Sequence, residues 1–202
     1  MAANYSRYLI KISAFLVLVT LLLGCEKTES THRFNSTDIT GATFARDFSL
    51  LDQKGQLRTL ADFRGKVVVV FFGYTHCPDF CPTTLSEFKS ISHKLGVSAD
   101  EVQFVFVTLD PERDTPPKLE TYLKAFDPKF VGLTGSIDDV STTAKEFKVI
   151  FQRVETSKPE RYSVDHSTGT FVFDKLGRIR LFIPYGQSTE ETLKDLQILL
   201  NE

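Results

Sequence analysis

Cysteine is scarce in this sequence, with three residues in 202, and tryptophan is absent. Three cysteines are too few for a small fold that disulfides hold together. Neither charge dominates, since 24 basic residues face 26 acidic ones, and this balance argues against a nucleic-acid-binding surface. Hydrophobic residues make up 42% of the chain, which excludes disordered and fibrous classes. We therefore expect one globular domain, without nucleic acid as a partner.

The N-terminal apolar run, residues 12–23, is shorter than the roughly 20 residues that a membrane-spanning helix needs. Arg7 and Lys11 precede it, as in a secretory signal peptide. It leads to Cys25 through a sequence that resembles the lipobox of bacterial lipoproteins. We expect residues 1–24 to be a lipoprotein-type signal peptide and Cys25 to be lipidated; the alternative is an uncleaved N-terminal anchor. Either predicts a domain tethered to the membrane, on the periplasmic side of a bacterial cell.

A change of composition marks the domain boundary. Residues 25–40 are polar and lack hydrophobic periodicity, so they predict a flexible tether, followed by one domain over 41–202. Within the domain, the apolar runs 66–73 and 102–109 are typical of parallel strands buried on both faces. Apolar residues at helical spacing between these runs predict a strand–helix–strand unit.

The remaining elements surround that unit. They are a hairpin over 48–60 with Gly55 in its turn, helices over 118–126 and 138–147, a short strand over 149–154, a hairpin over 170–183, and a last helix that a Ser188–Glu191 capping box opens. This order is that of an α/β, thioredoxin-like fold. We expect a central mixed sheet flanked by helices, with an N-terminal β-hairpin extension.

Cys77 and Cys81 lie in the segment that joins the first apolar run to the following helix. Each cysteine precedes a proline, which disfavours helical backbone in the residue before it, so neither thiol is expected inside a regular helix. Pro82 suits the first helical position, which makes Cys81 a candidate N-cap. The free amides and the positive dipole at that end favour a thiolate.

The spacing of the two thiols differs from that of a thioredoxin. Three residues separate Cys77 and Cys81 rather than two, and no tryptophan precedes them. The later stretch that carries a cis-proline in thioredoxins contains His166 here. Two thiolates and an imidazole form a soft, three-coordinate site; thiolates select Cu(I) or Zn(II), and imidazole accepts copper in either oxidation state.

The chain resembles the Sco/SenC family of copper-binding assembly proteins for cytochrome c oxidase over about residues 43–200. Three motifs carry the resemblance: GYTHCPDFCP at 73–82, DPERDT at 110–115 and DHS at 165–167. The resemblance implies that one copper ion, Cu(I) or Cu(II), has three ligands: Cys77, Cys81 and His166.

The same resemblance implies a copper metallochaperone that loads the dinuclear copper site of cytochrome c oxidase during assembly. Its partners would be the copper-site subunit of the oxidase and other periplasmic copper carriers or thioredoxin-like reductases. The alternative is a thiol–disulfide reductase that keeps the acceptor cysteines reduced through Cys77 and Cys81; otherwise we expect no classical enzyme. A thiol peroxidase is a third hypothesis, but the activating Arg and Thr that it needs beside its thiol are not evident in the sequence. A structural disulfide is disfavoured because so short a loop gains little stability.

Four further residues are candidates for orienting the ligands or for facing a partner: His76, Asp110, Asp114 and Asp165. The two central aspartates follow the second apolar run, at the end of the strand where α/β sites collect. A simpler role for Asp114, or for the next residue, is to cap the following helix. We also expect residues 158–162 to move when metal binds and to bring the histidine to the cysteines.

Overall fold

The computed structural model describes residues 34–155 and 162–202. The predicted signal peptide, Cys25, the first part of the tether and residues 158–161 lie outside the described residues. Within the described ranges, no helix has the length and apolar character needed to cross a membrane.

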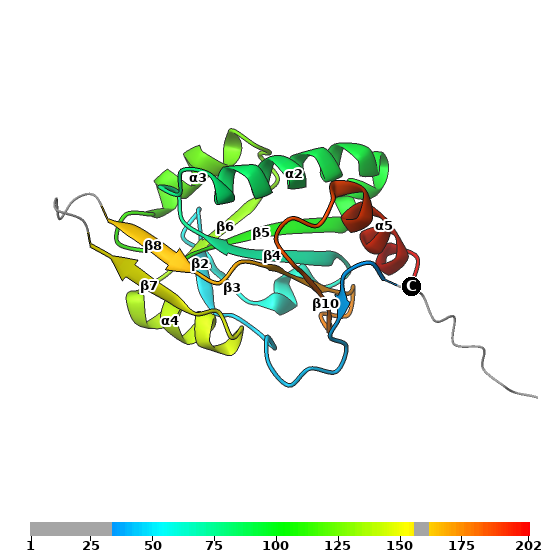
Figure 1. Ribbon diagram of the computed structural model, residues 1–202, viewed down its shortest axis with the longest axis horizontal. Helices are drawn as coiled ribbons and strands as arrows, with labels where there is room; N and C mark the ends of the chain where they lie inside the picture. Colours follow the sequence, from blue (N-terminus) through cyan, green and yellow to red (C-terminus); the bar gives the residue numbers. More distant parts are fainter. Residues whose placement is uncertain (1–33, 156–161) are drawn as a thin grey trace, which may run out of the picture. The chain divides into compact units, whose positions relative to one another are not determined.

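Eight strands of the described ranges form a mixed sheet in the order β1-β10-β9-β4-β5-β6-β2-β3 (Figure 1). Their bounds are Thr37–Asp38 (β1), Leu50–Asp52 (β2), Leu57–Arg58 (β3), Val67–Gly73 (β4), Val102–Thr108 (β5), Val131–Thr134 (β6), Thr170–Phe173 (β9) and Ile179–Ile183 (β10). The strands β4, β5 and β6 are parallel, while β9, β10 and β2 run antiparallel to their neighbours. A separate ribbon pairs β7 (Phe151–Val154) with β8 (Ser163–His166).

Helices cover both faces of this sheet. The helical segments are η1 (Leu60–Phe63), α2 (Phe80–Leu95), η2 (Gly96–Glu101), α3 (Pro116–Lys124), α4 (Ile137–Glu146) and α5 (Thr189–Leu200). Figure 1 shows α2 and α3 over one face and α4 beneath the other, with the β7–β8 ribbon beside α4. The predicted mixed sheet with flanking helices is therefore confirmed.

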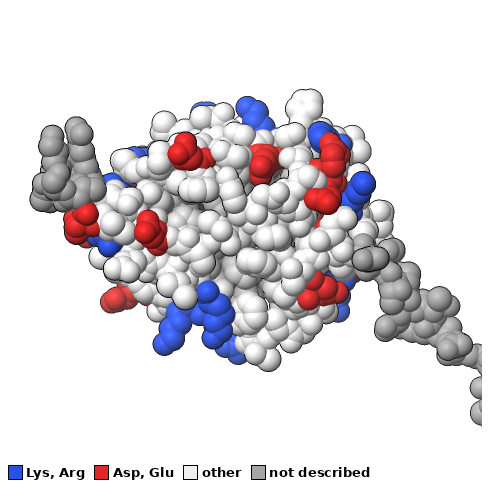
Figure 2. All heavy atoms as spheres, viewed as in Figure 1, with Lys and Arg blue, Asp and Glu red and all other residues white. Residues whose placement is uncertain are grey.

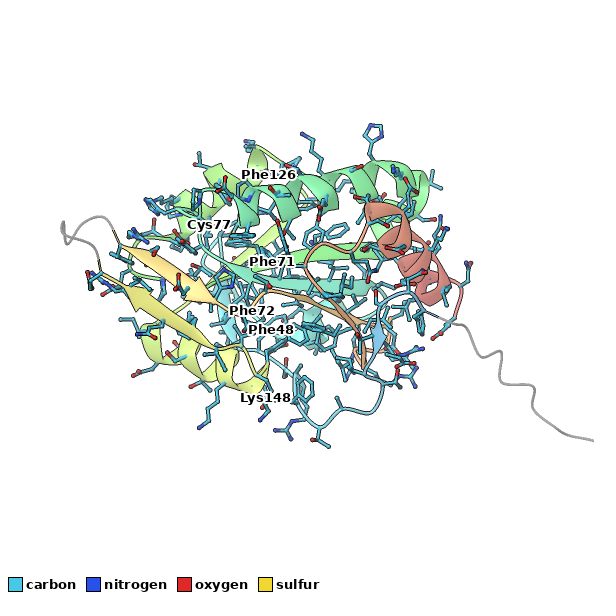
Figure 3. All side chains as sticks on the ribbon, viewed as in Figure 1. Phe48, Phe71, Phe72, Cys77, Phe126 and Lys148 are labelled. Carbon is cyan, nitrogen blue, oxygen red and sulfur yellow. The ribbon has the colours of Figure 1, made fainter. Side chains whose placement is uncertain are left out.

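The central strand β4 explains why the sheet needs cover on both sides. All seven of its residues are buried, and consecutive side chains point to opposite faces. Phe71 packs edge-on against Phe88 of α2, whereas Phe72 packs against Phe147 at the end of α4 (Figure 3). Burying one such side chain stabilises the fold by about 1.5–3 kcal/mol, so this strand anchors both helical layers.

The two predicted hairpins are present, and in each a buried aspartate at the start of the turn accepts hydrogen bonds from the backbone of that turn. Asp52 accepts hydrogen bonds from the amides of Lys54 and Gln56, at 2.8 and 2.9 Å, across a turn in which Gly55 has a φ of 76°. Asp174 accepts the equivalent bonds in the β9–β10 hairpin. Side-chain bonds of this kind fix the turns without needing partners elsewhere in the chain.

Residues 34–40, which the sequence assigns to the flexible tether, are part of the described structure. Buried Asp195 of α5 accepts hydrogen bonds from the amides of Asn35 and Ser36, both at 2.8 Å. β1 then pairs with β10. The polar composition of residues 34–40 suggests a flexible spacer, but these polar groups have partners about 160 residues away in the sequence.

The surface carries mixed charge on the face drawn in Figure 2. Acidic and basic side chains occur there in small separate groups, with uncharged surface between them. This pattern matches the near balance of charge in the sequence.

Candidate metal centre

The cysteine segment follows β4 at the carboxyl end of the parallel strands. Helix α2 begins at Phe80, so Cys81 lies in its first turn, and Asp79 is the N-cap, without a side-chain capping bond. The expectation that Cys81 caps the helix and stays outside it is therefore wrong. Pro82 is tolerated in the first turn because the amides there have no partner within the helix, so the helix can begin before the proline.

Both thiols are free and buried, with exposed fractions of 8% for Cys77 and 0% for Cys81. The backbone N–H of Cys81 donates to the sulfur of Cys77 at 3.4 Å, and the N–H of Cys77 donates to the carbonyl of Tyr74 at 3.2 Å. Figure 3 shows Cys77 near the start of α2, at the end of the sheet. The local backbone therefore holds the two cysteines as one unit, with Cys77 as the more accessible thiol.

The environment of Cys81 does not favour a thiolate in the metal-free protein. Burial raises the pKa of the Cys81 thiol, and this effect exceeds the opposing hydrogen bond from the backbone of Tyr74. The expectation that the helix start promotes ionisation is thus wrong for Cys81. A helix terminus favours an anion most clearly where solvent also reaches it, and here the sulfur is fully enclosed.

His166 is the last residue of β8 and is half-buried. Its Nδ1 lies 3.0 Å from the carbonyl oxygen of Ser167, and its ring packs edge-on against Tyr74, with 6.3 Å between ring centroids. A carbonyl only accepts hydrogen bonds, so a neutral ring in this position carries its proton on Nδ1 and leaves Nε2 to bind a metal. This is the arrangement by which a neighbouring carbonyl orients a metal-binding imidazole.

The three predicted ligands share a neighbour, Tyr74, but do not form a closed cluster. Tyr74 contacts both parts of the candidate site, because its backbone bonds the cysteines while its ring meets His166. Among the described residues, however, the donor atoms of Cys77, Cys81 and His166 do not all lie within 4.8 Å of one another. Metal–ligand bonds of about 2.0–2.3 Å require donors roughly 4 Å apart, so the site must contract to hold one ion.

The donor atoms of His76, Asp110 and Asp114 do lie within 4.8 Å of one another. Fully buried Asp114 accepts bonds from the amide of Thr75 at 2.9 Å, from the hydroxyl of Thr75, and from the hydroxyl of Thr108 at 2.7 Å. These bonds occupy the carboxylate, which therefore serves the protein scaffold. Asp114 holds the segment that leads to the cysteines.

Of the two residues considered as helix caps, Thr115 takes that position and Asp114 does not. Thr115 is the N-cap of α3, but no side-chain capping bond is present there. Pro116 and Pro117 begin the helix, and their fixed φ suits the first turn. The helix start thus relies on proline, which leaves Asp114 free to bond the cysteine segment.

Asp110 binds a different part of the site. Its carboxylate pairs with Arg113 and accepts a hydrogen bond from the hydroxyl of Tyr162 at 2.6 Å. The guanidinium groups of Arg113 and Arg153 lie 3.5 and 3.6 Å from the centroid of the Tyr162 ring. Two cations so close to one centroid must lie on opposite faces of the ring. Sequence reasoning missed Tyr162 in this role, because its partner Asp110 is 52 residues away.

The last two candidate residues have weaker links to the thiols. His76 is exposed, and its Nε2 lies 3.1 Å from the ammonium of Lys118. Burial, followed by the Lys118 charge, lowers the pKa of His76. Asp165 is exposed and precedes His166 on β8, so strand alternation directs its side chain to the opposite face.

Residues 36–201 of the chain match the model of the SCO1/SenC family. The chain belongs to this family. A mitochondrial SCO2 homolog from Mus musculus is 37% identical over 153 residues, which cover 75% of this chain and 60% of the mouse protein. This chain therefore spans less than two thirds of that relative.

Solved Sco structures share the fold. Copper-bound ScoI from Bradyrhizobium japonicum has a TM-score of 0.70 and 36% identity, and the match covers 76% of this chain and 97% of ScoI. Apo Sco1 from Thermus thermophilus has a TM-score of 0.75 and 39% identity, with coverage of 84% and 99%. The thioredoxin-like fold predicted from the order of elements is confirmed.

Proposed function

We propose that this Sco protein binds one copper ion through Cys77, Cys81 and His166 and delivers it to the dinuclear copper site of cytochrome c oxidase. One observation carries the proposal: the two free thiols, linked by a backbone hydrogen bond, and the ring of His166, oriented by a carbonyl, both have Tyr74 as a neighbour. Family membership supports it, since Sco proteins include copper-bound structures and cytochrome c oxidase assembly proteins.

The donor set fits copper as cargo. Two sulfurs and one imidazole nitrogen suit Cu(I), and the imidazole also suits Cu(II). Binding at Cys81 displaces the thiol proton, because only the thiolate is a ligand. A site with three ligands leaves room for a thiolate or imidazole of the acceptor, so copper can pass on by exchange of one ligand at a time.

An exposed aromatic pair beside the cysteines supports contact with a protein acceptor. Phe80 lies between the two cysteines in the sequence and is 50% exposed, and Tyr185 is 45% exposed. Their rings pack edge-on with centroids 5.1 Å apart. Exposed aromatic side chains next to a functional group are typical of surfaces that a partner covers.

A thiol–disulfide reductase is the second candidate, and the difference in exposure between the thiols favours it. The Cys77 thiolate would attack one sulfur of an acceptor disulfide, form a mixed disulfide and release one acceptor thiolate. Cys81 would then attack Cys77, form the Cys77–Cys81 disulfide and free the second acceptor thiolate. A thioredoxin-like dithiol reductant would return the pair to its reduced form.

Copper titration of the reduced domain, with metal analysis, tests the proposal. Wild type should bind one equivalent, and the double variant C77S/C81S should bind none. H166A should weaken copper binding strongly yet retain thiol–disulfide exchange, whereas H93A, at an exposed histidine of α2, should leave both unchanged. Wild-type copper affinity in H166A would contradict the three-ligand site and favour the reductase.

Localisation completes the proposal. A lipid at Cys25, after removal of residues 1–24, would hold the domain on the periplasmic side of the membrane, where an oxidase under assembly presents its copper site. The support is the sequence pattern around Cys25, together with a SCO1/SenC family lipoprotein known from Bacillus anthracis.

A further inference from the structure

The loop between β5 and α3 contacts both segments that carry the proposed ligands. At its C-terminal end, Asp114 binds the amide and hydroxyl of Thr75, two residues before Cys77. At its N-terminal end, Asp110 accepts a bond from Tyr162, four residues before His166. One rigid loop thus connects the cysteine segment with the strand that bears the histidine.

Tyr162 makes two polar contacts with this loop on the histidine side. Its hydroxyl donates to Asp110, and its backbone carbonyl accepts from Nη1 of Arg113 at 3.1 Å. Burial, together with the bond to Asp110, raises the pKa of Tyr162 to about 12, so the hydroxyl stays protonated and keeps donating at neutral pH.

The β7 strand is tied to the same loop. Arg153 stacks on the Tyr162 ring from the face opposite Arg113, and its guanidinium also pairs with Glu112 at 3.0 Å. In the register of the ribbon, Arg153 faces Val164 of β8. The ring of Tyr162 therefore lies between Arg113 of the loop and Arg153 of the ribbon.

The ribbon needs such a tie because it is not part of the main sheet. Among the described strands, β7 and β8 pair only with each other, so no ladder of backbone hydrogen bonds fixes their angle to β4 and β5. The short link from β8 to β9 and a few contacts set it instead: the stacking on Tyr162, the buried side chain of Val164, and Tyr74, which meets His166 and bonds the Val164 backbone.

We propose that Tyr162 is a positioning residue for copper binding: it ties β8 to the Asp110–Asp114 loop and thereby limits how far His166 can move from the cysteine pair before the site contracts around copper. This inference rests on the proposed copper site. Tyr162 itself is not a ligand and acts only through the placement of His166.

Copper affinity, measured by competition with a chelator, tests this role in two variants. Y162F removes the bond to Asp110 but keeps the stacked ring, and Y162L removes both. The dissociation constant should rise in that order, by roughly tenfold or more for Y162L, the usual effect of losing a group that orients a ligand. S136A is the matched control, because it removes a hydroxyl bond to an aspartate of the same 2.6 Å length at the start of α4, outside the proposed copper site; it should bind copper like the wild type.

A second measurement separates positioning from general loss of stability. Y162L should cause no further loss of copper affinity in an H166A background, because the ligand that Tyr162 positions is already absent. In the metal-free protein, hydrogen exchange at the amides of 163–166 should be faster in Y162L, whereas β4 and β5 keep wild-type protection.

Several outcomes overturn the inference. If Y162L lowers copper affinity equally in the wild-type and H166A backgrounds, the role of Tyr162 is merely structural. If hydrogen exchange at β8 is unchanged in Y162L, Tyr162 does not hold β8 to the Asp110–Asp114 loop. Failure of the wild type to bind copper, or wild-type copper affinity in H166A, contradicts the proposed function. Either result also contradicts the role of Tyr162 in positioning a copper ligand. Hydrogen exchange needs no metal, so it still reports whether the tie exists.

Discussion

Gly73 leaves the space that the sulfur of Cys81 occupies. A Cβ atom at Gly73 would lie 2.7 Å from Cys81 Sγ and 3.0 Å from the ring of Phe106. Real Cβ atoms do not approach so closely, and the buried sulfur has no room to retreat. The last residue of β4 therefore sets the depth at which the second thiol sits.

The first prediction follows from this contact. G73A should destabilise the domain by about 1–3 kcal/mol, the usual cost of overpacking, and should also weaken copper binding because Cys81 must shift. G132A is a matched control, since its Cβ would lie 2.7 Å from Leu123 Cδ1, in β6 rather than beside the cysteines. It should destabilise comparably in urea denaturation and leave copper affinity unchanged. Wild-type copper affinity in G73A would contradict the role given to this contact.

The second prediction concerns Asp114. D114N should destabilise the domain by about 1–3 kcal/mol. The NH2 group of asparagine is a donor, and it would face the Thr75 amide and the Thr108 hydroxyl, which are also donors, so these buried groups lose hydrogen bonds. Urea denaturation measures this change. D62N, at an exposed aspartate that caps η1, should have a smaller effect. Equal losses in the two variants would mean that burial of the Asp114 network adds nothing.

The third prediction is a dependence of copper affinity on pH. The pKa of Cys81 is raised above its ordinary value of 9.0, so the thiol is protonated at neutral pH and must lose its proton when copper binds. Apparent affinity should therefore rise by about tenfold or more per unit between pH 6 and pH 8. Competition titrations at fixed ionic strength measure the slope. A flat profile would exclude Cys81 as a ligand.

The same shift predicts how the metal-free protein responds to alkali. The folded state holds the Cys81 proton more tightly than the unfolded state does, so the resulting stability is present below pH 9 and is lost as the pH rises further. The urea midpoint of unfolding should decrease from pH 7 to pH 10, and this decrease should be larger in wild type than in C81S. An equal fall in both would show that other groups govern alkaline stability.

A fourth prediction concerns the anchor. The mature full-length protein, extracted from membranes of a bacterial host, should carry an acyl mass at its N-terminal cysteine, and C25S should lack it. C77S provides the control, because loss of an internal thiol should leave the lipid in place. Detergent phase partition followed by intact-mass spectrometry distinguishes these forms. An unmodified chain that retains residues 1–24 would favour the uncleaved anchor.

Much of the fold follows from local patterns in the sequence. The apolar runs that became β4 and β5 need cover on both faces, and the turn of the first hairpin depends on its own residues, Asp52 and Gly55. The capping box that opens α5 forms between Ser188 and Glu191, as predicted. Such features depend on residues a few positions apart, so the sequence alone determines them.

Other features depend on distant partners and were missed. Ser36 bonds Asp195, far away in the sequence, and β8 pairs with β7, which no local pattern around residues 163–166 predicts. The depth of Cys81 follows from its packing against Gly73, which no local rule reports. Two of the proposed ligands could thus be identified by spacing, while the bonds that orient them could not.

The bonds from Asn35 and Ser36 to Asp195 also limit how far the domain can travel. If a lipid holds Cys25, only the eight residues 26–33 separate the membrane from the folded domain. An extended chain covers at most about 3.6 Å per residue, so this segment spans no more than roughly 29 Å. Lipidation would therefore hold the point where the described domain starts within that distance of the membrane surface.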